Sequence, residues 1–447
     1  MELAKKYQSS DSTVARFCKS VGWKGYYTGK FIMLRICGIV LCTSTKETVF
    51  KSESITARIA QLVVSDSLIV SVAFKNYGQS YNAIQKTRNV AASKKTRIGC
   101  GWMKAVVLLG PNSFGPKVIE KPMINENEIL LKMMKAAICG TDTRILEGKK
   151  TKDVRYPSVI GHEMCGTIAE VGQKVTGYEI GEKISIANVI PCGSCNSCLN
   201  GRENACINRT AIGYQYDGGF QEYIRIPKSC IDAGNVVKLP ENVSFTAGAL
   251  IEPLACCIRG LINSGTKFND TVLIVGTGPI GLMHLQLAKI SGASKVIVSE
   301  PNEFRRDKAK LLGADVIVNP ITENLEEILM KETNGLGVDV IMVAIGVPAI
   351  VNSTLKLCKK GGTVCLFAGF SGTGECSIEA NIIHYNEINV CGSTAYKRSD
   401  YLAAAEMVKT GKINLDEIAT HTYKLDDFIG AYEMNKSGAG LKIMIEP

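Results

Sequence analysis

The sequence predicts an α/β protein that combines a mostly β, barrel-like domain with a doubly wound parallel sheet. From Met103 to about residue 250, short apolar runs alternate with glycine and proline, a pattern typical of strands joined by turns. Beyond residue 251, apolar strands alternate with helical segments, which favours a parallel sheet covered by helices. The first of these strands, Thr271–Val275, is continuously apolar, as expected for a strand buried on both faces.

Positive charge is confined to the first quarter of the 447-residue chain. Residues 1–102 hold 16 Lys and Arg against 5 Asp and Glu, whereas the remainder holds 36 against 37. The main body therefore lacks the basic excess of a nucleic-acid-binding protein. The 17 cysteines are scattered and no secretory signal begins the chain, so we expect a reducing, cytoplasmic location and no disulfide framework.

The N-terminal segment, residues 1–102, is predicted to be an extension of unknown role. Its apolar stretches, Phe31–Cys42 and Gln61–Phe74, are too short and too interrupted to span a membrane. The composition is compatible with an organelle-targeting segment or a basic tail that binds an acidic partner. Because a strand pattern begins at Met103, this methionine is a candidate for the true start.

Candidate metal ligands open the second quarter of the chain. Cys139 follows an apolar strand, and His162 and Glu163 follow some twenty residues later. Thiolate, imidazole and carboxylate are ligand types of a catalytic zinc. An isolated cysteine is more often a buried core thiol, but the adjacent His and Glu are poor choices for a core.

Four further cysteines have the spacing C-x2-C-x2-C-x7-C: Cys192, Cys195, Cys198 and Cys206. Four thiolates so close together indicate a structural zinc with no open position. An iron–sulfur cluster is the chemical alternative, although the last spacing and the absence of a following proline argue against it.

A dinucleotide-binding turn follows the strand Thr271–Val275. Its glycines, Gly276, Gly278 and Gly281, allow a tight turn and a close approach of the backbone to a pyrophosphate at the helix N-terminus. Glu300 ends the next strand and would bind ribose hydroxyls while repelling a 2′-phosphate, which favours NAD over NADP. Arg305 and Arg306 leave NADP open, because an arginine near this position can accept the 2′-phosphate.

These motifs together resemble the zinc-containing medium-chain dehydrogenase family, and its sorbitol (polyol) and threonine dehydrogenase branch in particular. The resemblance rests on Cys139–Asp142 (CGTD), Gly161–Gly166 (GHEMCG), the four-cysteine loop and Glu252-Pro253, and it covers about Met103 to Pro447. It implies a GroES-like catalytic domain formed by residues 103–250 and 396–447. A Rossmann domain, residues 251–395, would be inserted between these two segments.

The resemblance also implies roles for individual residues. Cys139, His162 and Glu163 would ligate the catalytic zinc, and Glu252 would be a fourth ligand or hold a zinc-bound water. Glu252 can also be read as an ordinary acid at a helix N-terminus beside Pro253. In the catalytic domain, Thr141 would accept the substrate proton, Asp142 would orient His162, and Tyr396 would face the substrate cleft.

The resemblance also implies contacts with the cofactor. Ile280 would pack on the cofactor, Arg305 would lie by the adenosine ribose, and Phe367–Gly369 would lie near the nicotinamide.

The expected function is oxidation of a secondary alcohol, a polyol or sugar alcohol, to a ketone by NAD+ with two zinc ions per chain. Two departures from the family weaken sorbitol itself as substrate: Arg144 replaces a proton-relay histidine, and Ala395 replaces an arginine. Threonine and a phosphorylated sugar alcohol are the alternative substrates. A non-catalytic zinc and nucleotide-binding protein, or a zinc-free quinone reductase, is opposed by the complete motifs. The expected partners are a small alcohol and further copies of the chain, as a dimer or tetramer, without nucleic acid or membrane.

Overall fold

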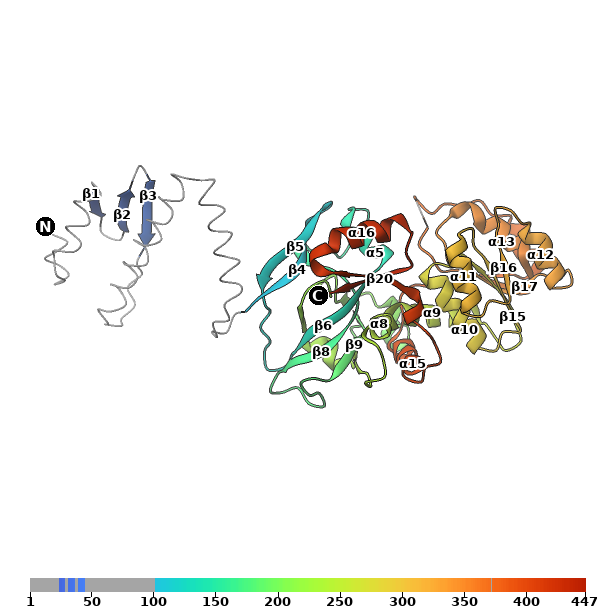
Figure 1. Cartoon of the computed structure of the whole chain (residues 1–447), viewed down its shortest axis with the longest axis horizontal. Coiled ribbons are helices and arrows are strands. Elements are labelled where there is room, and N and C mark those ends of the chain that lie inside the picture. Colours follow the sequence, from blue (N-terminus) through green and yellow to red (C-terminus); the bar gives the residue numbers. More distant parts are fainter. Residues whose placement is uncertain (1–23, 29–30, 37–38, 45–100, 371) are drawn as a thin grey trace. The chain divides into compact units, whose positions relative to one another are not determined.

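The computed structural model describes residues 24–28, 31–36, 39–44, 101–370 and 372–447 (Figure 1). The chain divides into two compact units, Met1–Arg97 and Ile98–Pro447. In the first unit, β1 (Lys24–Thr28), β2 (Phe31–Ile36) and β3 (Ile39–Ser44) form an antiparallel sheet in that order. The other expectations for residues 1–102 lie outside the described residues. No helix among the described residues is long and apolar enough to cross a membrane.

The region after residue 101 begins with a mostly β half. Its main sheet has seven strands in the order β13-β9-β8-β6-β21-β20, with β12 also paired to β6. A three-stranded sheet, β5-β4-β7, and the small pair β10-β11 complete this half. The strands are β4 (Trp102–Gly110), β5 (Ser113–Glu120), β6 (Ile129–Ile138), β7 (Ser158–Val159), β8 (Glu163–Val171), β9 (Lys183–Ile186), β10 (Val189–Ile190), β11 (Thr210–Ala211), β12 (Tyr223–Ile226), β13 (Val236–Lys238), β20 (Ala419–Lys424) and β21 (Lys442–Glu446).

The second half is a six-stranded parallel sheet in the order β16-β15-β14-β17-β18-β19. Alternate residues of its central strand enter opposite cores: Val272 and Ile274 join one hydrophobic cluster, and Leu273 joins another. This two-sided burial explains why the strand is continuously apolar. The strands are β14 (Thr271–Val275), β15 (Lys295–Ser299), β16 (Val316–Val318), β17 (Val338–Val343), β18 (Cys358–Leu366) and β19 (Asn389–Gly392).

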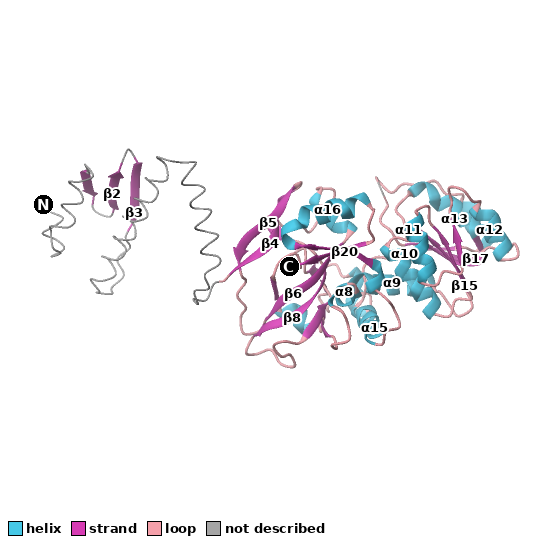
Figure 2. Ribbon diagram, in the orientation of Figure 1, coloured by secondary structure: helices cyan, strands magenta, loops and turns pink. Residues whose placement is uncertain are grey.

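Helices cover the parallel sheet, whereas strands dominate the other half (Figure 2). The strand order reverses at β14, whose neighbours are β15 and β17, and ligands of such sheets bind at this reversal. The helices are α5 (Gly140–Leu146), α6 (Asn196–Leu199), α7 (Lys228–Asp232), α8 (Phe245–Ala249), α9 (Ile251–Ser264), α10 (Pro279–Ile290), α11 (Glu303–Leu311), α12 (Leu325–Glu332), α13 (Val351–Leu357), α14 (Ala380–Asn386), α15 (Arg398–Lys409) and α16 (Phe428–Ser437), with short 3-10 turns η1 (Glu203–Ala205), η2 (Pro348–Ile350), η3 (Asp416–Ile418) and η4 (Leu425–Asp427).

The chain returns to the mostly β half at its C-terminus. β21 pairs antiparallel with β6, with Met444 opposite Ala137, and β20 pairs with β21. Helix α15 packs on α9, where a buried ion pair joins Arg259 and Asp400 at 2.7 Å between Nε and Oδ2. The parallel sheet is therefore inserted between two parts of the mostly β half, which confirms the predicted fold class.

Candidate active site and metal centres

Cys139 lies where β6 ends and helix α5 begins. It is the N-cap of α5: its Sγ accepts a hydrogen bond from the Thr141 backbone N–H at 3.5 Å. The Cys139 backbone N–H in turn donates to Asp142 Oδ2 at 2.9 Å. This reciprocal pair is a capping box in which a thiol takes the usual place of a hydroxyl. Local sequence therefore fixes the thiol at the end of β6.

His162 and Glu163 reach the same place by strand pairing. Glu163 opens β8 and lies opposite Ala137 of β6, two residues before Cys139. The candidate ligand atoms of Cys139, His162 and Glu163 all lie within 4.8 Å of one another. Both His162 and Glu163 are buried, so the three donors converge in a site shielded from bulk water. One thiolate, one imidazole and one carboxylate at this separation could hold a zinc ion.

Asp142 orients the candidate histidine ligand. Its Oδ1 lies 3.1 Å from His162 Nδ1, and Asp142 itself is fully buried. A histidine bound through Nδ1 to a carboxylate presents Nε2 to a metal. Burial alone lowers the pKa of His162, but attraction from Asp142 and Tyr214 outweighs it and raises the pKa well above its usual value.

Lys442, on β21, forms a buried ion pair with both carboxylate oxygens of Glu163. Burial lowers the pKa of Lys442, but the negative charges of Glu163 and Cys139 raise it overall. The ammonium therefore stays charged and holds the Glu163 side chain beside Cys139 and His162. Sequence analysis missed Lys442, because its partner is 279 residues away; the only signal is a lysine at the start of the short apolar run Ile443–Ile445.

Glu252 lies close to these donors but outside the group within 4.8 Å. It is in the first turn of α9 and is 7% exposed. Burial, followed by repulsion from Glu163, raises the pKa of Glu252 to about 7, although His162 opposes the shift. The structure thus brings three of the four predicted catalytic ligands together and places the fourth nearby.

A cavity of about 690 Å³ connects the metal site with the parallel sheet. Thr141, His162, Glu163 and Glu252 line it from the mostly β half. Opposite them, the lining includes Ile280 and Arg305 beside the dinucleotide turn and Phe367, Ala368 and Gly369 after β18. A nicotinamide cofactor and an alcohol could therefore meet beside the metal site in this cavity.

The glycine-rich turn has the space that a dinucleotide requires. Gly276 has φ +89°, and a Cβ on Gly281 would approach the Gly276 carbonyl oxygen to 1.9 Å. Neither position accommodates another residue. Gly278 differs, because a Cβ there would meet nothing within 4 Å. Gly278 is the N-cap of α10 and makes no side-chain capping bond, so backbone N–H groups face open space as a pyrophosphate site needs.

Glu300 and Arg305 lie differently with respect to the cavity. Glu300 is 3% exposed, and its carboxylate accepts hydrogen bonds from the backbone N–H groups of Thr277 at 2.7 Å and Asn302 at 3.0 Å. It is not among the lining residues. Arg305 lines the cavity and donates to the Gly438 carbonyl at 2.8 Å. Glu300 therefore stabilises the turn through hydrogen bonds to its backbone, whereas Arg305 connects the C-terminal segment to the cofactor side of the cavity.

Tyr396 lies beneath the cavity rather than on its lining. Its side chain is 2% exposed, and its hydroxyl donates to Asn188 Oδ1 at 2.6 Å. The backbone N–H of Val189 also donates to this hydroxyl at 3.3 Å. Asn188, Val189 and the neighbouring Ala395 line the cavity instead. Tyr396 thus supports the cavity wall, and sequence analysis did not identify Asn188.

The four-cysteine loop gathers its sulfurs into one cluster. The Sγ–Sγ distances are 3.6 Å for Cys195–Cys198, 3.8 Å for Cys195–Cys206 and 3.5 Å for Cys192–Cys206. Four sulfurs bound at about 2.3 Å to one zinc are about 3.8 Å apart, so the spacing fits a tetrahedral site. Backbone hydrogen bonds from Ser194 and Cys195 lower the pKa of Cys192 to about 6, which favours the thiolate.

Comparisons with known proteins identify the class. Residues 125–241 match the family profile described as "Alcohol dehydrogenase GroES-like domain", and residues 279–410 match the one described as "Zinc-binding dehydrogenase". The chain is 35% identical over 349 residues to the L-threonine 3-dehydrogenase of Pyrococcus furiosus, a match that covers 76% of this chain and 98% of that enzyme.

Solved structures agree with these matches. A Sinorhizobium meliloti protein bound to NADP superimposes with TM-score 0.73 at 32% identity, covering 78% of this chain and all of that one. The 2R,3R-butanediol dehydrogenase of Bacillus subtilis gives TM-score 0.70 at 26% identity, with coverage of 77% and 99%. The protein is therefore a zinc-dependent dehydrogenase that uses a nicotinamide cofactor. The chain belongs to the zinc-containing medium-chain dehydrogenase family, as the sequence motifs predicted.

Proposed function

We propose that this protein oxidises a secondary alcohol to a ketone with NAD+ as hydride acceptor. The observation that carries the proposal is the convergence of Cys139, His162 and Glu163 on a cavity that also reaches the dinucleotide turn. A zinc ion held by these residues supplies Lewis acidity, which lowers the pKa of a substrate hydroxyl. A bound nicotinamide supplies the hydride acceptor.

Individual residues of the chain have distinct roles in this proposal. Thr141, the second residue of α5, lines the cavity, and its hydroxyl accepts the proton of the substrate hydroxyl while passing its own proton to water. Asp142 holds His162 in one orientation, and Lys442 holds Glu163 through the buried ion pair. Glu252 lines the same cavity just outside the group of three donors, and it is proposed as a fourth zinc ligand or as the residue that holds a zinc-bound water.

The dinucleotide site is proposed to form around Gly276, Gly278, Ile280 and Gly281, with Arg305 at its edge. Glu300 supports a preference for NAD by adding negative charge behind the turn, where a 2′-phosphate would be repelled. The four cysteines of the loop are proposed to bind a second, structural zinc, which would fix the loop without taking part in chemistry.

Similarity to enzymes with named substrates favours two kinds of alcohol as the substrate of this protein. Similarity to L-threonine 3-dehydrogenases supports an amino alcohol, the alternative raised by the sequence, and similarity to a butanediol dehydrogenase supports a vicinal diol. Both are secondary alcohols. A polyol remains a candidate of the same class.

A homo-oligomer is proposed from the edge of the parallel sheet. Strand β19 is the last strand of that sheet, and Val390 and the nearby Tyr385 are exposed at 41% and 72%. An edge with exposed apolar side chains favours pairing with another copy. Light scattering of the purified full-length protein would determine the number of chains.

Thr141→Val tests the proton-transfer step. We expect kcat for NAD+ reduction with L-threonine or 2,3-butanediol to fall by about 100-fold or more, since general base catalysis contributes about 10²–10⁴-fold. Thr141→Ser, which keeps a hydroxyl, is the matched control and should retain most of the rate. A valine variant as fast as the wild type would show that Thr141 does not accept the proton.

A further inference from the structure

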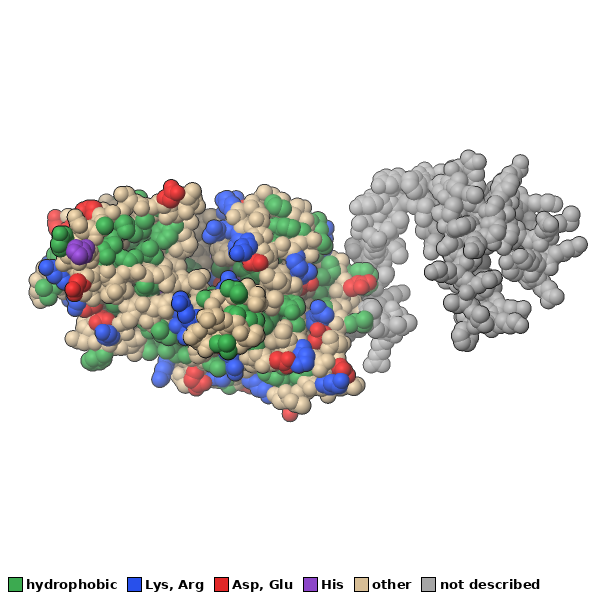
Figure 3. Space-filling view, turned by 180° about the vertical axis from the view of Figure 1, so that it is seen from behind, with side chains coloured by type: hydrophobic (Ala, Val, Ile, Leu, Met, Phe, Trp, Pro, Cys, Tyr) green, Lys and Arg blue, Asp and Glu red, His purple; other side chains and the backbone are tan. Residues whose placement is uncertain are grey.

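Three cationic side chains line the cavity besides Lys442, which pairs with Glu163, and the cofactor-side Arg305: Arg144, Lys150 and Arg209. They come from α5, from the segment after it, and from the segment preceding β11. On the face drawn in Figure 3, Lys and Arg side chains gather beside the hollow between the two halves of the 101–447 region. The proposed function gives no role to any of these three cations.

Aromatic contacts place this cluster on the metal side of the cavity. Lys150 Nζ lies 4.9 Å from the centre of the Tyr214 ring, and that ring lies 5.8 Å from the His162 ring. Arg144 is three residues after Thr141 on α5, so the two side chains share a helix face. Its Nη1 lies 3.3 Å from the position of a Cβ built on Gly369. Lys150 therefore lies on the metal side of the cavity, and Arg144 reaches from α5 toward the loop after β18.

The positive charge of the cluster is only partly offset by the protein, because Asp153 is the one carboxylate besides Glu163 and Glu252 that lines the cavity. Within the described residues, no carboxylate lies within 4.0 Å of the charged nitrogens of Arg144, Lys150 or Arg209. Arg209 and Lys150 instead donate to the carbonyls of Asn204 at 2.9 Å and Lys152 at 3.4 Å. Burial lowers the pKa of Lys150; the nearby Asp153 opposes this shift, whereas Arg209 and Arg144 reinforce it. The three cations thus repel one another.

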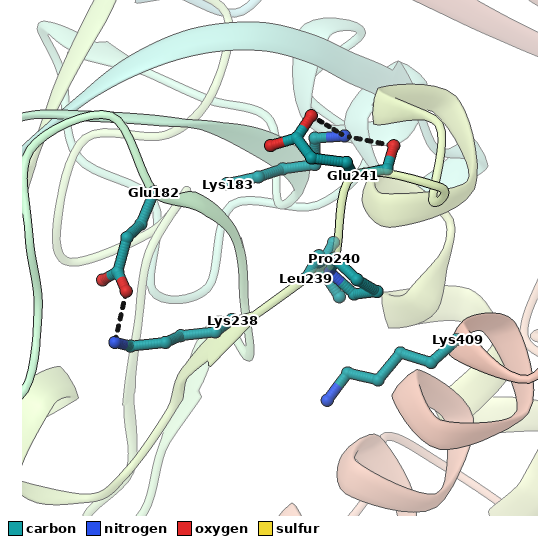
Figure 4. A pocket seen from close by; sticks show the side chains of 7 residues that line it. All are labelled: Glu182, Lys183, Lys238, Leu239, Pro240, Glu241 and Lys409. Atoms are coloured by element: carbon teal, nitrogen blue, oxygen red, sulfur yellow. Dashed lines mark hydrogen bonds and ion pairs between the residues drawn. The ribbon is translucent and has the colours of Figure 1, made fainter.

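A second depression in the protein surface is also lined by lysines, but these lysines have carboxylate partners. Its lining includes Lys183, Lys238 and Lys409, but also Glu182 and Glu241 (Figure 4). Lys238 pairs with Glu182, Lys183 pairs with Glu241 at 3.7 Å, and Lys409 lies 3.9 Å from Glu406. Lysines at that depression are matched by carboxylates, whereas the cations of the metal-side cluster are not.

We propose that Arg144, Lys150 and Arg209 bind an anionic group of the substrate. The inference rests on the proposed function and adds to it the substrate class: a secondary alcohol that carries a carboxylate or a phosphate. Unpaired cations in a partly enclosed site gain charge-assisted hydrogen bonds from such an anion. The same cluster gives no advantage to a neutral polyol.

The cofactor is the competing source of negative charge, and the positions of Lys150 and Arg209 argue against it for these two cations. The pyrophosphate position is at the N-terminus of α10, in the parallel-sheet half, where Arg305 is the nearest lining cation in sequence. Lys150 and Arg209 belong to the mostly β half; Lys150 lies over the Tyr214 ring beside His162, and Arg209 is close enough to Lys150 to affect its pKa.

The test compares matched substrates with the full-length, zinc-loaded protein and NAD+. One pair is L-threonine and L-threoninamide, which differ in the carboxylate; the other is sorbitol 6-phosphate and sorbitol. 2,3-Butanediol serves as a neutral alcohol that reports the proposed function by itself. We expect one anionic substrate to exceed its neutral partner in kcat/KM, and the pair that shows the preference identifies carboxylate or phosphate.

Variants of single cationic residues then test which of them cause the preference for an anionic substrate. Arg209→Gln and Lys150→Gln should each reduce the anionic-to-neutral ratio of kcat/KM by about tenfold, the effect of losing one charge-assisted hydrogen bond. Lys149→Gln removes the same charge from an adjacent, exposed residue that pairs with Glu147, and should leave the ratio unchanged.

Other outcomes would overturn the inference. Turnover of 2,3-butanediol without an anionic preference would leave the proposed function standing and refute the anion site alone. Variants that raise only the KM for NAD+ would assign the cations to the cofactor. Absence of turnover on every substrate would refute the proposed function, and the inference with it.

Discussion

Asp142 makes two hydrogen bonds at the metal centre, one to the Cys139 backbone and one to His162 Nδ1. It therefore ties the first candidate ligand to the second, although they are 23 residues apart. Sequence analysis predicted that Asp142 orients His162, because a ligand histidine needs a partner for its other ring nitrogen. It did not predict the cap on α5, because cysteine is an unusual N-cap.

Asp142→Asn tests this orienting role. We expect zinc affinity at the catalytic site to fall by about 10–100-fold, since the amide binds the imidazole less strongly than a carboxylate does. Competition with a fluorescent zinc chelator measures the change. Asp232→Asn, at an exposed position paired with Lys228, is the control and should bind zinc like the wild type. Equal affinity in both variants would remove Asp142 from the metal centre.

At the scale of elements, the four-cysteine loop has little regular structure of its own. Only the short helix α6 and the turn η1 lie between its cysteines, and Leu199 and Ile207 are exposed at 75% and 82%. A loop without an apolar core depends on a metal for its order. The spacing of the cysteines was sufficient to predict the cluster, because all four ligands lie within 15 consecutive residues.

Cys192→Ser should therefore destabilise the protein and lower its zinc content by one ion per chain. We expect Tm to fall by more than about 4 °C, because a loss of only about 2 kcal/mol shifts Tm by about 4–8 °C in a domain of this size. Cys376→Ser, at an exposed cysteine outside both metal groups, is the control. If Cys192→Ser melted like the wild type with its zinc content unchanged, no structural zinc would be present.

The strands and helices that sequence analysis predicted correctly are those with strong periodicity or continuous burial. Thr271–Val275 and Lys295–Ser299 coincide with β14 and β15. Boundaries differ where local signals are weak: the apolar run 128–137 predicts a strand that spans Ile129–Ile138 in the structure, and the apolar run 282–290 predicts a helix that begins earlier, at Pro279. Proline is compatible with the first turn of a helix, which explains the earlier start.

At the scale of the whole molecule, the active-site cavity is assembled from segments far apart in the chain. β6, β8 and α9 supply the metal-site residues, α10 and the loop after β18 supply the cofactor side, and β21 returns with Lys442. The motifs of the first two groups are local, so the sequence revealed them. The positions of Lys442 and Tyr214, and the proximity of Lys150 to Arg209, depend on tertiary contacts, which no local pattern indicates.

The most direct test of the account is NAD+ reduction by the full-length protein before and after its zinc is removed. L-threonine and 2,3-butanediol are the substrates, and the absorbance of reduced nicotinamide is the signal. We expect turnover on at least one substrate, loss of turnover on chelation, and recovery when zinc is restored, with two zinc ions bound per active chain. Unchanged turnover in zinc-free protein, or no NAD+ reduction by protein that holds both zinc ions, would contradict the central claim.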